Sequence, residues 1–140
     1  MEINKEFLNI VQSHLGYSED QMTVLQDNPK TMEIVAKLPD LMNTSFHFKV
    51  LNAHGCAAQH KSGDSIQFDG FGCINQQPGQ RVCAFAISAM SQLIWTAQEF
   101  IYAGVDPNTM KLNRVGCIDV GVKCGGLGNV TFEFEAKKNG

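Results

Sequence analysis

The stretch 82–103 constrains the fold most, because its apolar residues follow the spacing of one long helix. They recur at steps of three and four along a single helix face. The stripe consists of Cys83, Ile87, Met90, Ile94, Ala97 and Ile101. Polar residues such as Ser88 and Gln92 fall on the opposite side, and Gly104 supplies a C-terminal stop. The sequence therefore predicts one long helix with a single apolar face.

Segments with a period of two lie on both sides of this helix in the chain. Residues 46–50 and 66–68 alternate apolar with polar side chains before it, and residues 130–136 do so after it. Residues 114–120 also have the character of a strand. This alternation is typical of half-buried strands. We therefore predict an α+β fold, in which an antiparallel sheet of about four strands, built as two hairpins, packs on the long helix.

The first 43 residues have helical rather than strand periodicity. Ser18 and Gln21 form a capping-box pattern, and Asn28 followed by Pro29 marks the start of a third short helix. Pro39 is expected to end that helix. The predicted organisation is a helical N-terminal cap over residues 1–43 and an α+β cysteine-containing domain over residues 44–140, together in one compact unit.

Charge and hydropathy exclude two broad classes of partner. The chain has 140 residues and a net charge of -3, and it contains no Lys/Arg cluster of the kind that phosphate backbones require. Polar residues interrupt every apolar run before it could cross a membrane. The N-terminus has no apolar signal region. We expect neither nucleic-acid nor membrane binding, and a cytoplasmic location.

The five cysteines form no C-x-x-C pair. An odd number of cysteines without an export signal argues against a disulfide framework, so the thiols are expected to be reduced. Zinc ribbons and most ferredoxin-type clusters use close cysteine pairs, because one turn can then offer two ligands. If these cysteines are ligands, they must converge from separate elements of the fold.

Three cysteines occupy positions from which convergence is plausible. Cys56 follows the first predicted strand and shares a loop with His60. Cys83 begins the long helix, where the helix N-terminus and the nearby Arg81 favour a thiolate. Cys117 lies in the third predicted strand, two residues before Asp119. For each of these cysteines, buried packing without a chemical role is the alternative. Cys83, for example, also belongs to the apolar stripe of the long helix.

These motifs resemble a small prokaryotic family, common in anaerobic bacteria and archaea, that has no established activity. Its pattern is C-x-x-G-H-K-x-G-D, then a Pro-Gly-x-C-x-x-A helix start, then C-P-D and a terminal V-x-F strand. The resemblance covers residues 44–136, and it implies a shared fold and site rather than a reaction. The matching positions are Cys56, His60, Gly63, Asp64, Cys83, Cys117 and Asp119. Gln59 replaces the usual Gly and Ile118 the usual Pro, which bears on loop shape.

The soft ligands in this set favour an iron–sulfur cluster, with zinc as the second choice. Cys56, Cys83 and Cys117 are the candidate metal ligands, and His60, a substrate or water could fill a fourth position. An open position is typical of a catalytic metal centre. His60, Asp64 and Asp119 are the candidate catalytic residues, and Asp64 could orient His60 through its second ring nitrogen. Either Cys73 or Cys124 could instead complete a four-cysteine site.

Two metal-free interpretations stay open, and the sequence does not decide whether the chain is an enzyme. In the first, the protein is a small-molecule-binding or accessory subunit whose cysteines are core packing. In the second, Cys83 is a nucleophile and His60 its general base. The expected partner is a small-molecule substrate or ligand, and a homo-oligomer or a partner subunit is equally open. The glycine-rich run 125–128 lacks the Lys-Ser/Thr of a phosphate loop.

Overall fold

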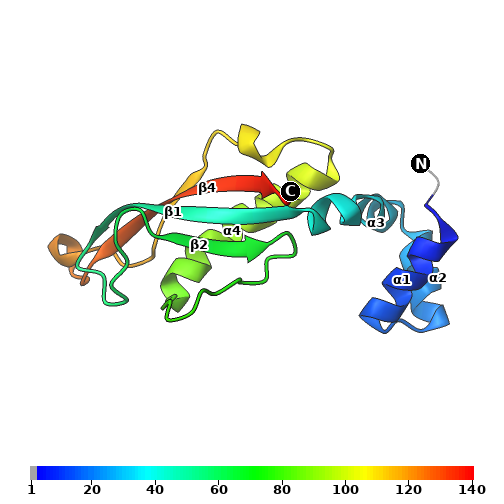
Figure 1. Ribbon diagram of the computed structural model, residues 1–140, viewed down its shortest axis with the longest axis horizontal. Helices are drawn as coiled ribbons and strands as arrows, with labels where there is room; N and C mark the ends of the chain where they lie inside the picture. Colours follow the sequence, from blue (N-terminus) through cyan, green and yellow to red (C-terminus); the bar gives the residue numbers. More distant parts are fainter. Residues whose placement is uncertain (1–2) are drawn as a thin grey trace. The chain divides into compact units, whose positions relative to one another are not determined.

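The computed structural model describes residues 3–140 and divides into two compact units. The first unit spans Met1–Pro39 and the second Asp40–Gly140. Figure 1 labels the helices and strands along the chain. The second unit contains every residue that the sequence singles out for chemistry.

Three helices begin the chain, each with a start that the sequence explains. Helix α1 (Lys5–Leu15) begins after Asn4, whose side chain accepts a hydrogen bond from the Glu6 amide at 2.8 Å. Helix α2 (Glu19–Asp27) begins with the predicted capping box between Ser18 and Gln21, in which both reciprocal hydrogen bonds are present. Helix α3 spans Pro29–Met42. The helical N-terminal segment is thus confirmed.

The prediction that Pro39 ends the third helix is wrong, because α3 continues through it to Met42. A proline removes one backbone donor, and this loss alone does not prevent a last helical turn. That turn carries Leu41, which is only 1% exposed. The Thr44 hydroxyl donates to the carbonyl of Asp40 at 2.7 Å and so satisfies one carbonyl near the helix end. Burial of Leu41 and this hydrogen bond favour the longer helix.

Four antiparallel strands form one sheet, in the order β2-β1-β4-β3. The strands are β1 (Thr44–His54), β2 (Ser65–Asp69), β3 (Arg114–Gly116) and β4 (Asn129–Lys138). β1 pairs with β2, and β3 pairs with β4, as the two predicted hairpins require. The long pairing of β1 with β4 joins the two halves at the centre of the sheet. The predicted α+β class is confirmed.

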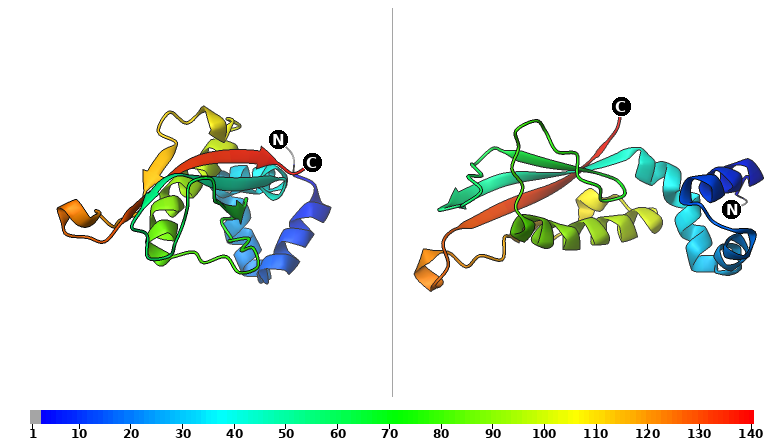
Figure 2. Two further views of the ribbon diagram at one scale, coloured as in Figure 1. Left: turned by 60° about the vertical axis from the view of Figure 1, so that its left-hand side comes forward. Right: turned by 90° about the horizontal axis from the view of Figure 1, so that it is seen from below.

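Helix α4 (Ala84–Tyr102) covers one face of this sheet, as the right-hand view of Figure 2 shows. Phe46, Phe48 and Phe132 of the central strands are 0% exposed on that face. The buried helix residues are Ala86, Ala89, Met90, Leu93, Ile94, Ala97 and Ile101, whereas Ile87 of the predicted stripe is 36% exposed. Within residues 3–140, no helix combines the length and the apolar character needed to cross a membrane.

A β-bulge in β1 changes which side chains face the core near the candidate site. Val50 lies opposite Phe132 and Asn52 opposite Thr131, so Leu51 is the extra residue. In an unbroken register Asn52 would lie opposite the buried Val130. The bulge instead places Ala53 opposite Val130. An apolar residue therefore faces the core at the end of β1 that leads to the Cys56 loop.

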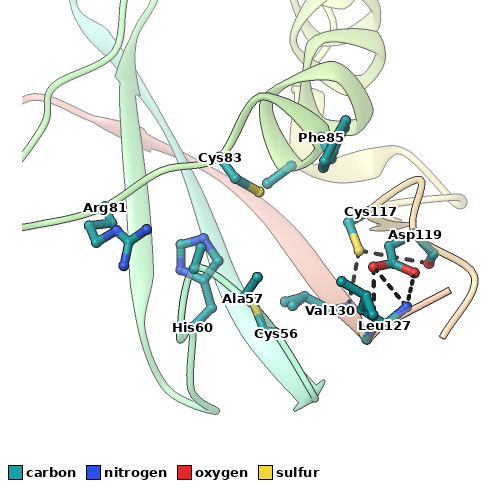
Figure 3. A pocket seen from close by; sticks show the side chains of 13 residues that line it. Cys56, Ala57, His60, Arg81, Cys83, Phe85, Cys117, Asp119, Leu127 and Val130 are labelled. Atoms are coloured by element: carbon teal, nitrogen blue, oxygen red, sulfur yellow. Dashed lines mark hydrogen bonds between the residues drawn. The ribbon is translucent and has the colours of Figure 1, made fainter. Parts of the chain in front are cut away.

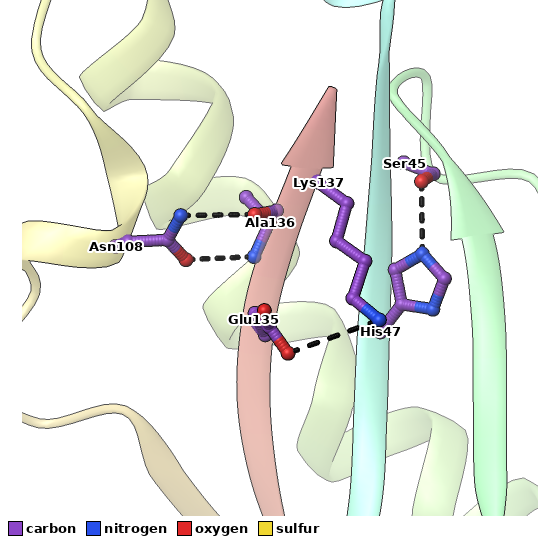
Figure 4. Close-up of polar contacts among 6 residues, drawn as sticks. All are labelled: Ser45, His47, Asn108, Glu135, Ala136 and Lys137. Carbon is purple, nitrogen blue, oxygen red and sulfur yellow. Dashed lines mark hydrogen bonds and ion pairs between the residues drawn. The ribbon is translucent and has the colours of Figure 1, made fainter. Parts of the chain in front are cut away.

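The Asn108 side chain extends the β4 ladder beyond the short strand β3. Asn108 lies in the 3-10 turn η1 (Pro107–Thr109). Its carboxamide accepts from the Ala136 amide at 2.8 Å and donates to the Ala136 carbonyl at 2.9 Å, as a neighbouring strand would (Figure 4). These two bonds tie the connection after α4 to the sheet.

Replacement of Asn108 by alanine is expected to lower the free energy of unfolding by about 2 kcal/mol, because it removes two hydrogen bonds from part-buried backbone groups. Asn108→Asp is the matched control, since it keeps the acceptor and loses the donor. We expect it to destabilise the protein as well. Urea unfolding of the three proteins measures both effects. Equal stability of wild type and Asn108→Ala would show that water replaces the two bonds at no cost.

Candidate functional site

The site lies at one end of the sheet, where β1 and β3 end and β4 begins. Because these strands are antiparallel, the end of β1, the end of β3 and the start of β4 meet at the same edge. The loop before α4 and the first turn of that helix complete the surround. A pocket of about 220 Å³ opens there.

Five of the residues that the sequence singled out line this one pocket. They are Cys56, His60, Cys83, Cys117 and Asp119. Figure 3 shows their side chains around the cavity, and the three cysteines come from three different segments of the chain. All three are partly buried free thiols. Their roles as ligands or catalytic groups stay predictions, but the fold brings them to one place.

The other three residues of the set, Asp64, Cys73 and Cys124, do not line this pocket. Asp64 lies in the turn before β2, where its carboxylate accepts a hydrogen bond from the Lys61 amide at 3.0 Å and makes none to His60. The orienting contact between Asp64 and His60 is therefore not formed. Cys73 and Cys124 are exposed and do not line the pocket.

The loop from Cys56 to His60 contains a strained residue. Gln59 adopts a φ of +62° and is the only described non-glycine residue with positive φ. Glycine takes this conformation freely, whereas a side chain is crowded there. Gln59 is also the position at which the resembled family has Gly. The backbone that presents His60 is thus one that glycine suits better.

Substitution of Gln59 by glycine is expected to raise the free energy of unfolding by about 1 kcal/mol, because it removes the left-handed strain. Gln59→Ala is the control, since it removes the same polar side chain while keeping a Cβ at positive φ. Chemical denaturation of both variants tests this. An alanine variant as stable as the glycine variant would mean that the side chain, not the backbone, limits stability.

His60 is buried and incompletely hydrogen-bonded. It is only 8% exposed, and its ring packs edge-on against the core residue Phe132 with centroids 6.1 Å apart. Its Nε2 atom is buried and has no hydrogen-bond partner among the described residues. A buried nitrogen of this kind costs about 1–3 kcal/mol unless something binds it. A ligand or metal bound in the pocket would satisfy this nitrogen and remove the cost.

Cys83 lies at the N-cap position of α4, rather than inside its buried stripe. Its thiol makes no capping hydrogen bond, so the first amides of this 19-residue helix receive no side-chain acceptor from it. The dipole of the helix favours negative charge at this end. The position suits a thiolate, whether that thiolate binds a metal or attacks a substrate.

Cys117 was predicted within a strand, but β3 ends one residue earlier, at Gly116. The Cys117 amide still bonds the Val130 carbonyl at 2.9 Å, and its sulfur accepts from the Val130 amide at 3.3 Å. An amide donor of this kind stabilises charge on sulfur. After the strand ends, the Asp119 carboxylate accepts hydrogen bonds from backbone amides of the following loop.

The Asp119 carboxylate holds that loop together. It accepts hydrogen bonds from the amides of Gly121 at 3.0 Å, Leu127 at 3.1 Å and Gly128 at 3.1 Å. The bond from Gly121, followed by that from Gly128, lowers the pKa of Asp119 below its usual value. A carboxyl group kept ionised in this way is poorly suited to donate a proton. Its geometry fits a positioning residue better than a general acid.

Two glycines allow this loop to approach the end of β1 closely. A Cβ on Gly128 would overlap the backbone of His54 and Gly55, and a Cβ on Gly126 would overlap the Asp119 carboxylate. Gly55 itself has a φ of +66° and faces the Leu127 carbonyl. The glycine-rich run thus serves as a close backbone contact. It seats the loop that follows Cys117 against the turn that precedes Cys56.

The thiols and the imidazole do not converge on a single point. Within residues 3–140, no group of three or more His, Cys, Asp or Glu side chains is arranged to hold one metal ion. A mononuclear zinc site needs its ligands about 2.0–2.3 Å from one centre. An iron–sulfur cluster is likewise held by cysteine thiolates, commonly four of them.

Sequence reasoning assigned no role to several residues of the pocket. Phe85, Ala86, Leu127 and Val130 form much of its apolar wall, and Gly128 admits the loop. Arg81 was noted only for its effect on Cys83, although its side chain lines the cavity. In the sequence, Gly55 and the glycine-rich run 125–128 could have indicated that two backbone segments approach each other closely at Gly128. No sequence feature marked the apolar residues of the pocket wall.

Comparisons with protein-family models, with curated proteins and with solved structures found no match to this chain. The resemblance to the prokaryotic family stays a prediction.

Proposed function

We propose that the pocket binds a metal cofactor through Cys56, Cys83 and Cys117, and that this cofactor is an iron–sulfur cluster. One observation carries the proposal. Three thiols from separate parts of the chain line a single pocket together with the buried imidazole of His60, whose Nε2 atom has no partner among residues 3–140. Soft thiolate ligands favour iron–sulfur clusters and zinc over other common metals.

Among residues 3–140, no group of three or more His, Cys, Asp or Glu side chains is arranged to hold a metal ion, so the geometry favours neither metal. We put a cluster first because cysteine thiolates are its usual protein ligands and three thiols line the pocket. Two of the thiols also have surroundings suited to negative charge, namely the α4 N-terminus at Cys83 and the Val130 amide at Cys117. Zinc stays the second choice.

Three cysteines leave one iron of a four-iron cluster without a protein thiolate. An iron with an open position can act as a Lewis acid on an oxygen- or sulfur-bearing substrate. His60 lies in the same pocket and could bind that iron or the substrate. We propose that the protein acts on a small molecule, since the pocket volume of about 220 Å³ is below the range of about 300–1,000 Å³ typical of drug-sized ligands.

A second candidate is a thiol enzyme without a metal. The α4 N-terminus favours a thiolate at Cys83, and the unpartnered His60 lines the same pocket, which matches a nucleophile and its general base. Anaerobic reconstitution with iron and sulfide separates the two candidates. The cluster gives broad visible absorption and protects Cys83 from iodoacetamide. A colourless protein whose Cys83 is alkylated much faster than the exposed Cys124 would favour the thiol enzyme.

A further inference from the structure

The N-terminus of α4 is an uncapped helix end at the pocket. The Cys83 thiol makes no capping hydrogen bond, and Phe85 and Ala86 of the first turn line the cavity. The first amides of a helix have no partners within it, and the helix dipole adds positive partial charge there. A negatively charged group in the cavity would be stabilised by this end of the helix.

His60 points to a ligand independently of the helix. It is 8% exposed, its Nε2 atom has no hydrogen-bond partner among the described residues 3–140, and its ring projects toward the segment that carries Arg81 and Cys83 (Figure 3). A ring that carries its proton on Nε2 is a donor without an acceptor. A ligand with an acceptor oxygen would satisfy it.

Arg81 adds a full positive charge beside His60. Its exposed guanidinium makes no ion pair or hydrogen bond with residues 3–140, and it lines the cavity. A second, more polar pocket adjoins the first and shares Ala58, His60 and Arg81 with it. Lys61 and Asp64 line that second pocket, so the two cations outnumber the single carboxylate there. Arg81 is therefore the one side chain with a full charge that lines both of these pockets.

We propose that the ligand is a small molecule with an oxyanion group, a carboxylate or a phosphate, that binds between the two pockets. His60 Nε2 and Arg81 donate hydrogen bonds to the oxyanion, and the α4 N-terminus stabilises its charge. The rest of the molecule reaches the cysteines. This inference rests on the proposed function for its catalytic meaning, and it assigns His60 to the substrate rather than to iron.

The test is an NMR titration of the metal-free, full-length protein with acetate and, separately, with inorganic phosphate. Chloride keeps the ionic strength constant. The signals to follow are the imidazole nitrogens of His60 and the amides of Ala84 to Ala86. We expect saturable shifts with one of the two anions. Arg81→Gln and His60→Gln should each weaken binding at least about 10-fold, because each removes a donor to a charged group.

Lys111→Gln is the matched control, since Lys111 is exposed and lines neither pocket. It should bind the anion as wild type does. Saturation with acetate alone identifies a carboxylate ligand, and saturation with phosphate alone a phosphate. The inference is overturned if neither anion competes with chloride, or if Arg81→Gln binds as tightly as wild type. Arg81 is exposed, so this variant is expected to fold even if His60→Gln does not.

The titration and the iron measurement can fail separately. A protein that holds no iron but shows these shifts would overturn the cluster and leave the anion site standing. A protein that binds iron but whose metal-free form shows no anion-dependent shifts would overturn the anion site and leave the cluster standing. The two results together say whether the pocket is a cluster site, an anion site or both.

Discussion

The Cys83→Ser variant is expected to lose its iron and sulfide. Cys83 is one of three thiols in the pocket and the one at the α4 N-terminus. Loss of a ligand should lower metal affinity by more than about 100-fold, since loss of a mere supporting contact already costs about 10–100-fold. Iron and sulfide analysis after anaerobic reconstitution measures this. Cys56→Ser and Cys117→Ser should behave in the same way.

The two exposed cysteines provide the controls for this experiment. Cys124→Ser and Cys73→Ser remove thiols that do not line the pocket, so both should keep most of the wild-type iron. Circular dichroism of each variant shows whether it is folded. A folded Cys83→Ser protein with full iron content would remove Cys83 from the site. Loss of iron from Cys124→Ser would show that the exposed thiol takes part.

Gly128→Ala is expected to have the largest effect of any single methyl group added near the site. The new Cβ would overlap the backbone of His54 and Gly55, which cannot rotate away as a side chain can. We expect a loss of about 3 kcal/mol in the free energy of unfolding, the upper part of the usual range for overpacking. To relieve the overlap, the loop that follows Cys117 would have to move away from the turn that precedes Cys56. Metal affinity should fall together with stability.

Gly116→Ala is the matched control for this steric argument. Gly116 ends β3 at the same edge of the sheet, yet a Cβ there would meet only the Val130 carbonyl, at 3.8 Å. Its variant should be as stable as wild type within about 0.5 kcal/mol, as is usual for substitutions without a clash. Thermal unfolding of both variants gives the comparison. If Gly128→Ala were equally harmless, the close approach would not hold the loop in place.

Local pattern predicted where the helices and strands of the fold lie, although the third strand ends at Gly116 rather than at Val120. The apolar stripe gave α4, alternation gave the strands, and the capping box at Ser18 gave the start of α2. The misses arise from tertiary effects. Burial of Leu41 carries α3 past Pro39, and the β1 bulge depends on register against β4. The pairing of β1 with β4 joins segments far apart in the chain, and local pattern does not specify it.

The candidate site was predictable in its residue types and less so in its geometry. Spacing and chemistry singled out Cys56, Cys83 and Cys117, and these side chains line one pocket. The sequence did not reveal that Asp119 binds three amides, because this depends on the loop that follows it. Nor did it reveal the unpartnered nitrogen of His60, because burial is a property of the folded chain.

The most direct test of the central claim is the iron and acid-labile sulfide content of protein purified without oxygen, with zinc measured in the same sample. We expect iron and sulfide near stoichiometric amounts for one cluster per chain, and a brown sample with broad visible absorption. Protein that contains neither iron nor zinc, and binds none on reconstitution, would contradict the metal centre. The three thiols and His60 would then line a metal-free ligand pocket.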